Sequence, residues 1–340
     1  MQTKIPTHTK EQDEFLFYFA NSPSGGGVTR LSHYLRNIDT EGCNFLADSR
    51  CEKSFPQPDT RLKFLRSSFA VRMIDENYHV RKMSLGNTIV FSHGAPILPQ
   101  CKRFVLHINN ALPFVTERVN LGFVLRKKMS VLCRRLFRSA EQADLVTVES
   151  NSTLDLLEAT WGTAISRKSA ILGNGVDPVS QLVKVPWELP AQFSLAIGTY
   201  PYKRIERVID IAKQLSVGNP HSKLLIVGPI SKKLSEDDFI LNYPNVPYPL
   251  MRELLQRCDR YISMSQIENS SIAMLEAIFS KKNVVCSDIP SHLESLAKAG
   301  YRISREDGIL YAELDASNYS QPPSWLSIAE QTMELLKRTS

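Results

Sequence analysis

The chain of 340 residues has no long apolar run and no paired cysteines. No segment approaches the roughly 18 to 20 consecutive apolar residues that a membrane-spanning helix needs, and the first eight residues lack the apolar core of a secretion signal. The six cysteines are scattered, with no Cys-x-x-Cys pair and no histidine cluster. This pattern is typical of reduced, buried thiols rather than of disulfides or zinc ligands. We therefore expect a cytoplasmic protein.

Positive charge is concentrated in one short segment, although the net charge is only +6. The basic residues of this segment, with no acidic residue among them, are Arg126, Lys127, Lys128, Arg134, Arg135 and Arg138. Apolar residues are interleaved with them, so we expect a basic amphipathic helix over residues 120–140. Such a helix either lies on an anionic membrane surface or is simply the charged outer face of a helix packed on its own domain. No nucleic-acid-binding motif accompanies it, and we expect no nucleic acid as a partner.

Apolar runs alternate with helical patterns in two series along the chain. The runs of the first series are 15–20, 44–47, 88–92, 103–108 and 145–149, and those of the second are 193–198, 224–228, 261–265 and 284–287. Such alternation is typical of parallel sheets covered by helices on both faces, which predicts an α/β fold with two doubly wound domains. Pro178, Pro186 and Pro190 lie in a polar stretch between the two series and mark the boundary. Residues 51–81 show no clear pattern.

Two glutamates eight positions apart, Glu268 and Glu276, lie where a predicted strand runs into a helix predicted over 272–280. The first N–H groups of a helix that follows a parallel strand point at the crevice beyond the strand and suit a phosphate. Glu276 is placed to accept hydrogen bonds from two adjacent hydroxyls, as a ribose offers, and Glu268 to address a second group. Glutamate is also common on solvated helix faces, so the pair alone does not distinguish the two interpretations. Further on, Ser291 and Glu294 have the spacing of a capping box.

With the strand 283–288 and the turn 289–294 that follow, this segment resembles the C-terminal signature of family 4 glycosyltransferases. That signature is Glu, seven residues, Glu, a helix, a strand and a Ser-Asp-Ile-Pro-like turn. Four further segments are similar to landmarks of the family and occur in its order: a glycine loop at 25–27, a strand at 143–150, an Asn-Gly-Val-Asp passage within 172–178 and a lysine loop at 197–206. The resemblance therefore covers most of the chain.

The resemblance implies the GT-B fold, two Rossmann-like domains with a cleft between them. We expect an N-terminal acceptor-binding domain over 1–178, a C-terminal domain over 179–323 that binds the nucleotide sugar, and a last helix within 324–340 that crosses back to the first domain.

The family's functional residues map onto four parts of this sequence. Lys203 and Arg204 would offset the charge of a departing nucleoside diphosphate; many relatives carry an arginine where Thr199 stands, and Arg204 is the candidate substitute. His107 lies at the end of the predicted strand 104–108, and the family carries a histidine after the corresponding strand; His93 is its rival for that place.

The glycine loop would let backbone amides approach a phosphate, unless it is only a flexible turn. By resemblance the catalytic residues are His107, Lys203 and Glu268, and the donor-binding residues are Gly26, Gly27, Thr199, Lys203, Arg204, Glu268, Asn269, Ser270, Ser271, Ile272 and Glu276.

We therefore expect a retaining, hexosyltransferase-type glycosyltransferase. It would move a sugar from a nucleoside diphosphate to a hydroxyl of a lipid-linked or polysaccharide acceptor, in bacterial O-antigen, capsule or exopolysaccharide synthesis. No Asp-x-Asp occurs in the chain, so we expect neither a metal nor any cofactor beyond the sugar nucleotide. If the basic helix binds lipid, the enzyme lies peripherally on the inner face of the cytoplasmic membrane. The alternatives are a GT-B sugar-nucleotide epimerase or phosphorylase, or an inactive glycosyltransferase-like scaffold.

Overall fold

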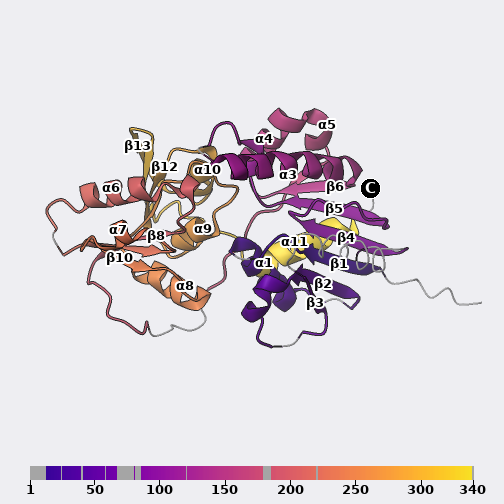
Figure 1. Cartoon of the computed structure of the whole chain (residues 1–340), viewed down its shortest axis with the longest axis horizontal. Helices are drawn as coiled ribbons and strands as arrows, with labels where there is room; N and C mark the ends of the chain where they lie inside the picture. Colours follow the sequence, from indigo (N-terminus) through magenta and orange to yellow (C-terminus); the bar gives the residue numbers. More distant parts are fainter. Residues whose placement is uncertain are drawn as a thin grey trace, which may run out of the picture.

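The computed structural model describes residues 13–338 except 24, 40, 58, 67–79, 81–85, 120, 179–184 and 220. Its described elements form two α/β lobes that lie side by side (Figure 1). The first twelve residues, about half of the unassigned region 51–81 and part of the linker around Pro186 lie outside the described residues.

The first lobe is built on a parallel sheet of the order β3-β2-β1-β4-β5-β6-β7. Its strands are β1 (Glu14–Phe19), β2 (Cys43–Asp48), β3 (Leu62–Leu65), β4 (Thr88–His93), β5 (Arg103–Ile108), β6 (Leu145–Val148) and β7 (Ser169–Ile171). In β1, Phe15 and Phe17 pack into one core while Leu16 and Tyr18 pack into another on the opposite face of the sheet. Because both faces are covered, the strand is apolar at consecutive positions instead of alternating.

Helices cover both faces of this sheet. They are α1 (Gly26–Asn37), α3 (Phe123–Gln142), α4 (Asn151–Trp161) and α5 (Thr163–Ser166), with the short 3-10 helices η1 (Ser49–Ser54) and η2 (Leu112–Phe114). None of the helices in the described part of the chain is long and apolar enough to cross a membrane.

The second lobe has a sheet of the order β10-β9-β8-β11-β12-β14-β13. Its strands are β8 (Phe193–Ile197), β9 (Lys223–Val227), β10 (Ile240–Tyr243), β11 (Arg260–Ser263), β12 (Asn283–Ser287), β13 (Arg302–Glu306) and β14 (Ile309–Glu313). The sheet is parallel, as expected, except at one edge, where β14 pairs antiparallel with both β12 and β13. Asp307 and Gly308 join β13 to β14 with φ of 49° and 72°, the left-handed backbone that a tight hairpin turn requires.

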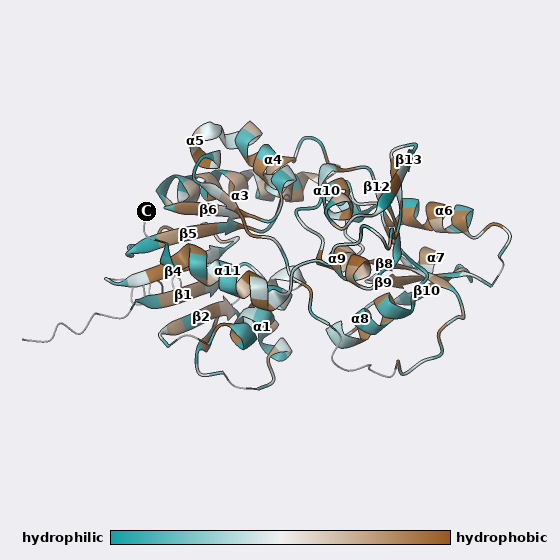
Figure 2. Cartoon of the chain, turned by 180° about the vertical axis from the view of Figure 1, so that it is seen from behind, coloured by the Kyte–Doolittle hydropathy of each residue, from teal (hydrophilic) through white to brown (hydrophobic). Residues whose placement is uncertain are grey.

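The helices of the second lobe are η3 (Pro201–Lys203), α6 (Ile205–Leu215), α7 (Lys232–Ser235), α8 (Tyr248–Arg257), α9 (Ile272–Phe279) and α10 (Pro290–Lys298). Apolar residues are concentrated on the strands, and the helices carry polar residues on their outer sides (Figure 2). This is the distribution that two separately packed cores produce.

The last helix, α11 (Trp325–Lys337), returns to the first lobe and packs beside α1 (Figure 1). Trp325 is fully buried there and stacks on His33 with ring centres 4.9 Å apart. The hydroxyl of Tyr34 lies 2.7 Å from that of Thr332, so a polar contact joins the two helices as well. The chain thus crosses between the lobes twice.

The expected capping box at the start of α10 is wrong. Ser291 does not cap this helix, which has Ile289 at its N-cap and no side-chain capping hydrogen bond. The Glu294 carboxylate instead accepts hydrogen bonds from the backbone N–H groups of Asn151 (3.0 Å) and Ser152 (3.1 Å), at the start of α4 in the other lobe. The first N–H groups of α4 lack partners within their own helix, so a carboxylate from outside satisfies and stabilises them.

Candidate active site

A cavity of about 410 Å³ lies between the two lobes, at the carboxyl ends of the central strands of both sheets. The first lobe contributes the glycine loop 25–27, His93 and the loop 109–112, and the second contributes Lys203 and the segment 267–273. In α/β folds, ligands bind in such a crevice beyond the strand ends.

The glycine loop forms the start of α1, which begins at Gly26. No side chain caps this helix, and the N–H groups of Val28 and Thr29 donate to Gly25 O, which leaves those of Gly26 and Gly27, two residues that line the cavity, without a capping side chain. A Cβ on Gly27 would collide with Ser22, and one on Gly26 would lie 3.1 Å from Cδ1 of Ile272. Glycine is therefore required for α1 to approach both its own loop and the opposite lobe this closely.

The start of α9 faces α1 across the cavity. The Ser271 hydroxyl accepts a hydrogen bond from Met274 N (3.3 Å) and caps this helix, which confirms the predicted turn and helix. Ser270, Ser271 and Ile272 all line the cavity, as expected. Two helix N-termini thus converge on one space, which favours an anionic ligand such as a diphosphate.

Lys203 and Glu268 both line the cavity and form a largely buried ion pair. The Glu268 carboxylate also accepts a hydrogen bond from the Ser265 hydroxyl (2.7 Å). Burial alone would lower the pKa of Lys203, but the contact with Glu268 outweighs it and holds that pKa above its ordinary value. Burial likewise acts to raise the pKa of Glu268, and the Lys203 ammonium outweighs it and lowers that pKa. Both groups are therefore charged at neutral pH.

Asn269 joins the two lobes. Its side-chain amide donates to Ile108 O (3.0 Å), its side-chain oxygen accepts from the Thr153 hydroxyl, and its backbone oxygen accepts from the Ser150 hydroxyl (2.7 Å). Asn269 lines the cavity, but these bonds use its polar atoms for holding the lobes together rather than for a ligand.

Glu276 does not line the cavity and is only 2% exposed. The Tyr248 hydroxyl donates a short hydrogen bond to one carboxylate oxygen, and Arg252 Nε lies 3.7 Å from the same atom. The second carboxylate oxygen is buried without a hydrogen-bond partner. Burial raises the pKa of Glu276 to about 7, although Tyr248 and Arg252 act in the opposite direction. In this conformation α8 covers the carboxylate that the sequence assigned to ribose.

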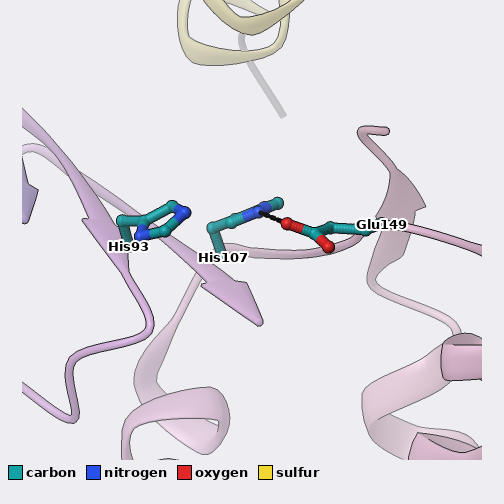
Figure 3. A group of neighbouring side chains, drawn as sticks. All are labelled: His93, His107 and Glu149. Atoms are coloured by element: carbon teal, nitrogen blue, oxygen red, sulfur yellow. Dashed lines mark ion pairs between the residues drawn. The ribbon is translucent and has the colours of Figure 1, made fainter. Parts of the chain in front are cut away.

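The two candidate histidines differ in position (Figure 3). His93 lines the cavity, with Nδ1 2.8 Å from the Ser22 hydroxyl, whereas His107 does not line it and stacks behind His93 with ring centres 5.1 Å apart. Burial and the nearby Arg30 hold the pKa of each imidazole well below its ordinary value, so both rings are neutral. The structure therefore brings His93, and not His107, to the cavity.

A buried cluster around Arg30 was missed by the sequence reading. Arg30 Nη2 donates to Gly173 O (2.8 Å) and to the Asn174 side chain (2.9 Å), and it lies 3.4 Å from the Glu149 carboxylate. Burial raises the pKa of Glu149 to about 7, against the opposing effect of Arg30. Glu149 directly follows β6 and Asn174 belongs to the Asn-Gly-Val-Asp passage, so position at strand ends was the available signal.

In the described part of the chain, His93, His107 and Glu149 form the one group whose ligand atoms are close enough for a metal ion, within 4.8 Å of one another. His107 Nε2 lies 3.5 Å from the Glu149 carboxylate (Figure 3). Arg30 contacts the same carboxylate oxygen, and a metal ion there would face its positive charge. The donor set fits an internal network around Arg30 better than a metal centre.

Neither Thr199 nor Arg204 lines the cavity. Arg204 is exposed and has a left-handed backbone (φ 52°), and the Thr199 side chain packs beside Gly228. In this conformation Lys203 is the one cation among the described residues that line the cavity, and the suggestion that Arg204 replaces the family arginine stays a prediction.

One family model matches part of the second lobe. Residues 191–321 match the family model described as glycosyl transferases group 1. A search of curated protein sequences gives no match.

Solved structures resemble the whole chain. HepE of Anabaena, solved in complex with UDP and glucose, has a TM-score of 0.70 at 13% identity and covers 96% of this chain and 100% of its own. Sucrose-phosphate synthase of Thermosynechococcus elongatus has a TM-score of 0.68 at 12% identity (95% and 98% covered). WaaG, a glycosyltransferase involved in lipopolysaccharide biosynthesis, has a TM-score of 0.64 at 14% identity (95% and 90% covered).

The chain therefore has the GT-B fold, with two Rossmann-like domains. Residues 191–321, in the second lobe, are similar to group 1 glycosyl transferases, which agrees with the resemblance to family 4 glycosyltransferases drawn from the sequence.

Proposed function

We propose that this glycosyltransferase binds a nucleoside diphosphate sugar in the interdomain cavity and transfers the sugar with retention of configuration. The observation that carries the proposal is the convergence of two helix N-termini, those of α1 and α9, with the charged Lys203 on one space. Backbone amides and one ammonium suit the oxygens of a diphosphate, whose negative charge grows as the sugar leaves.

His93 is the proposed contact to the reacting sugar, because it reaches the cavity from the acceptor side. Its neutral imidazole accepts or donates a hydrogen bond without placing positive charge beside Lys203. The ribose is proposed to bind Glu276 after Tyr248 moves away, so that ribose hydroxyls take over the hydrogen bond that Tyr248 now donates.

Retention is proposed to proceed by attack from the front face. The acceptor hydroxyl bonds to the anomeric carbon on the face from which the diphosphate departs, and its proton passes to the departing phosphate oxygen. The bond between the anomeric carbon and that oxygen breaks, and both of its electrons stay with the diphosphate. Lys203 stabilises the charge that develops there, so no enzyme nucleophile and no metal ion are required.

The proposed acceptor is a lipid-linked or polysaccharide precursor in bacterial surface polysaccharide synthesis. The fold shared with WaaG, which acts in lipopolysaccharide biosynthesis, supports this setting. The exposed cations and apolar side chains of α3 support peripheral contact with the inner face of the membrane, from a cytoplasmic enzyme.

The test is transfer itself, followed by the proton coupling of the new anomeric centre in NMR spectra. We expect a retained configuration and full activity in excess EDTA. Lys203→Ala should lower kcat by about a hundredfold or more, whereas Lys232→Ala, a control at a lysine whose side chain is 91% exposed, should leave it unchanged.

Inversion at the anomeric carbon, or a loss in EDTA that manganese or magnesium restores, would contradict the proposal. Conversion of the sugar nucleotide into an isomer without any acceptor would indicate an epimerase instead.

A further inference from the structure

A second cavity, of about 770 Å³, adjoins the donor cavity in the first lobe. The two share the lining residues Asn109 and Asn110, in the loop that follows β5. A molecule that fills the second cavity therefore ends beside the place where the donor sugar is proposed to react.

The charged side chains that line this second cavity are all positive. Its charged lining residues are Arg50, Lys127, Lys128 and Arg135, with no aspartate or glutamate among them. The Arg50 guanidinium is already neutralised, because it donates two hydrogen bonds to the Asp48 carboxylate (2.9 and 2.7 Å). The other three cations come from one helix, α3.

Lys128 and Arg135 have no carboxylate at ion-pair distance among the residues that the structure describes. They are seven residues apart in α3, which is about two helical turns, so they lie on one face of the helix. Lys127 lies over the Phe123 ring, 4.4 Å from its centre. Cations held without a counterion along a cavity wall raise the local concentration of anions and bind them through charged hydrogen bonds.

We propose that this cavity holds an acceptor that carries a phosphate group, bound by Lys128 and Arg135, with its sugar hydroxyl directed to Asn109 and Asn110. The inference rests on the proposed function and adds the chemical class of the acceptor. The phosphate belongs either to a soluble sugar phosphate or to the diphosphate of a lipid-linked sugar, and the chemistry of the wall is the same for both.

The test is calorimetric binding of three probes: a hexose 1-phosphate, a short-chain prenyl diphosphate-linked sugar and the uncharged hexose. The matched variants are Lys128→Ser/Arg135→Ser and Arg134→Ser/Arg138→Ser. Both remove two positive charges from α3, but only Lys128 and Arg135 line the cavity. We expect the first pair to weaken binding of at least one phosphate probe by about tenfold or more. The second pair should leave that affinity within about twofold, and the uncharged hexose should bind far more weakly than the phosphates.

Which phosphate probe binds identifies the source of the group. Equal losses in the two double variants would reduce the effect to general surface charge and overturn the proposal, as would a lack of binding by both phosphate probes. Loss in Lys203→Ala rather than in Lys128→Ser/Arg135→Ser would place the phosphate in the donor cavity and overturn it as well. Sugar-nucleotide binding, measured in the same protein, reports separately on the proposed function.

Discussion

Two buried ion pairs and one buried carboxylate determine the electrostatics of this site. Lys203 and Glu268 form one ion pair at the cavity, and Arg30 forms another with Glu149, which also lines the cavity. A buried charge without a partner costs free energy, so each ion pair holds its two side chains in place. The positions of the charges at the cavity are thereby fixed. Glu276 differs, since one of its carboxylate oxygens has no partner and its pKa is raised to about 7. That is the carboxylate most ready to accept new hydrogen-bond donors.

The histidine assignment can be tested by comparing His93→Gln with His107→Gln. His93→Gln should lower transfer by about a hundredfold or more, because His93 faces the cavity, and should leave nucleoside diphosphate binding nearly unchanged. His107→Gln should lower transfer much less, since His107 acts only by supporting the His93 ring. Initial rates and the free energy of unfolding of both variants are the measurements. A normal rate in His93→Gln with a severe loss in His107→Gln would return the role to His107.

Residue types and their order were enough to find the Glu268 to Ile272 segment, Lys203 and the glycine loop, because each follows a recognisable strand. Other contacts depend on packing between distant segments and left no local signal. Tyr248 covers Glu276 from a separate helix, and Glu294 reaches from α10 to α4 in the other lobe. His93 and His107 both lie at the carboxyl ends of their strands and pair with each other in the sheet, and only their depth in the fold distinguishes them.

At the scale of elements, the buried strands near the middle of each sheet were predicted well, and several strands toward the sheet edges were missed. The strands over 103–108 and 284–287 matched closely because both faces are apolar, which leaves a continuous signal. The strands β3, β7 and β10 have three or four residues and are partly exposed, so their sequences resemble loops. The β13–β14 hairpin carried an unused signal, the dipeptide Asp307-Gly308, which favours a tight turn.

The basic helix expected over 120–140 is α3, and its cations lie in two different environments. Lys128 and Arg135 line a cavity, whereas Arg134 and Arg138 are exposed to solvent. Large apolar side chains lie at its start, where Phe123 is 71% and Val124 80% exposed. This mixture of cationic and apolar exposure is typical of a helix that rests on a membrane surface.

Vesicle sedimentation tests this contact. The protein should pellet with anionic vesicles at low salt and much less at about 0.5 M salt, where charge is screened within a few ångströms. It should hardly pellet with neutral vesicles. Arg134→Ser/Arg138→Ser should weaken the binding, because each cation near an anionic surface contributes about 1 kcal/mol. Wild type that ignores anionic vesicles at low salt would make α3 an ordinary domain surface and remove the main support for a membrane-bound acceptor.

At the scale of the whole molecule, the two lobes are held together around the cavity. Asn269 bonds to the first lobe through its side chain and its backbone, the Glu294 carboxylate accepts from the start of α4, and the Asn174 amide donates to Ser270 O (2.9 Å). These contacts all lie beside the proposed donor loop, so binding there and closure of the lobes depend on each other. The covering of Glu276 by Tyr248 adds a second local rearrangement that a nucleotide has to produce.

The most direct test of the central claim, that this cleft binds a nucleoside diphosphate sugar, is calorimetric donor binding at pH 8, where Glu276 is ionised. A panel of UDP-, GDP-, ADP- and CMP-linked sugars first identifies the donor for wild type. Glu276→Ala should then weaken its binding by about tenfold to a hundredfold, because charged hydrogen bonds to ribose are lost. Tyr248→Phe removes the hydrogen bond from Tyr248 to Glu276 but leaves the carboxylate in place. This variant should therefore bind the donor at least as tightly as wild type. Wild-type affinity should fall below pH 7 as Glu276 takes up a proton. If no sugar nucleotide binds, or if Glu276→Ala stays within twofold of wild type, the account of the site is contradicted.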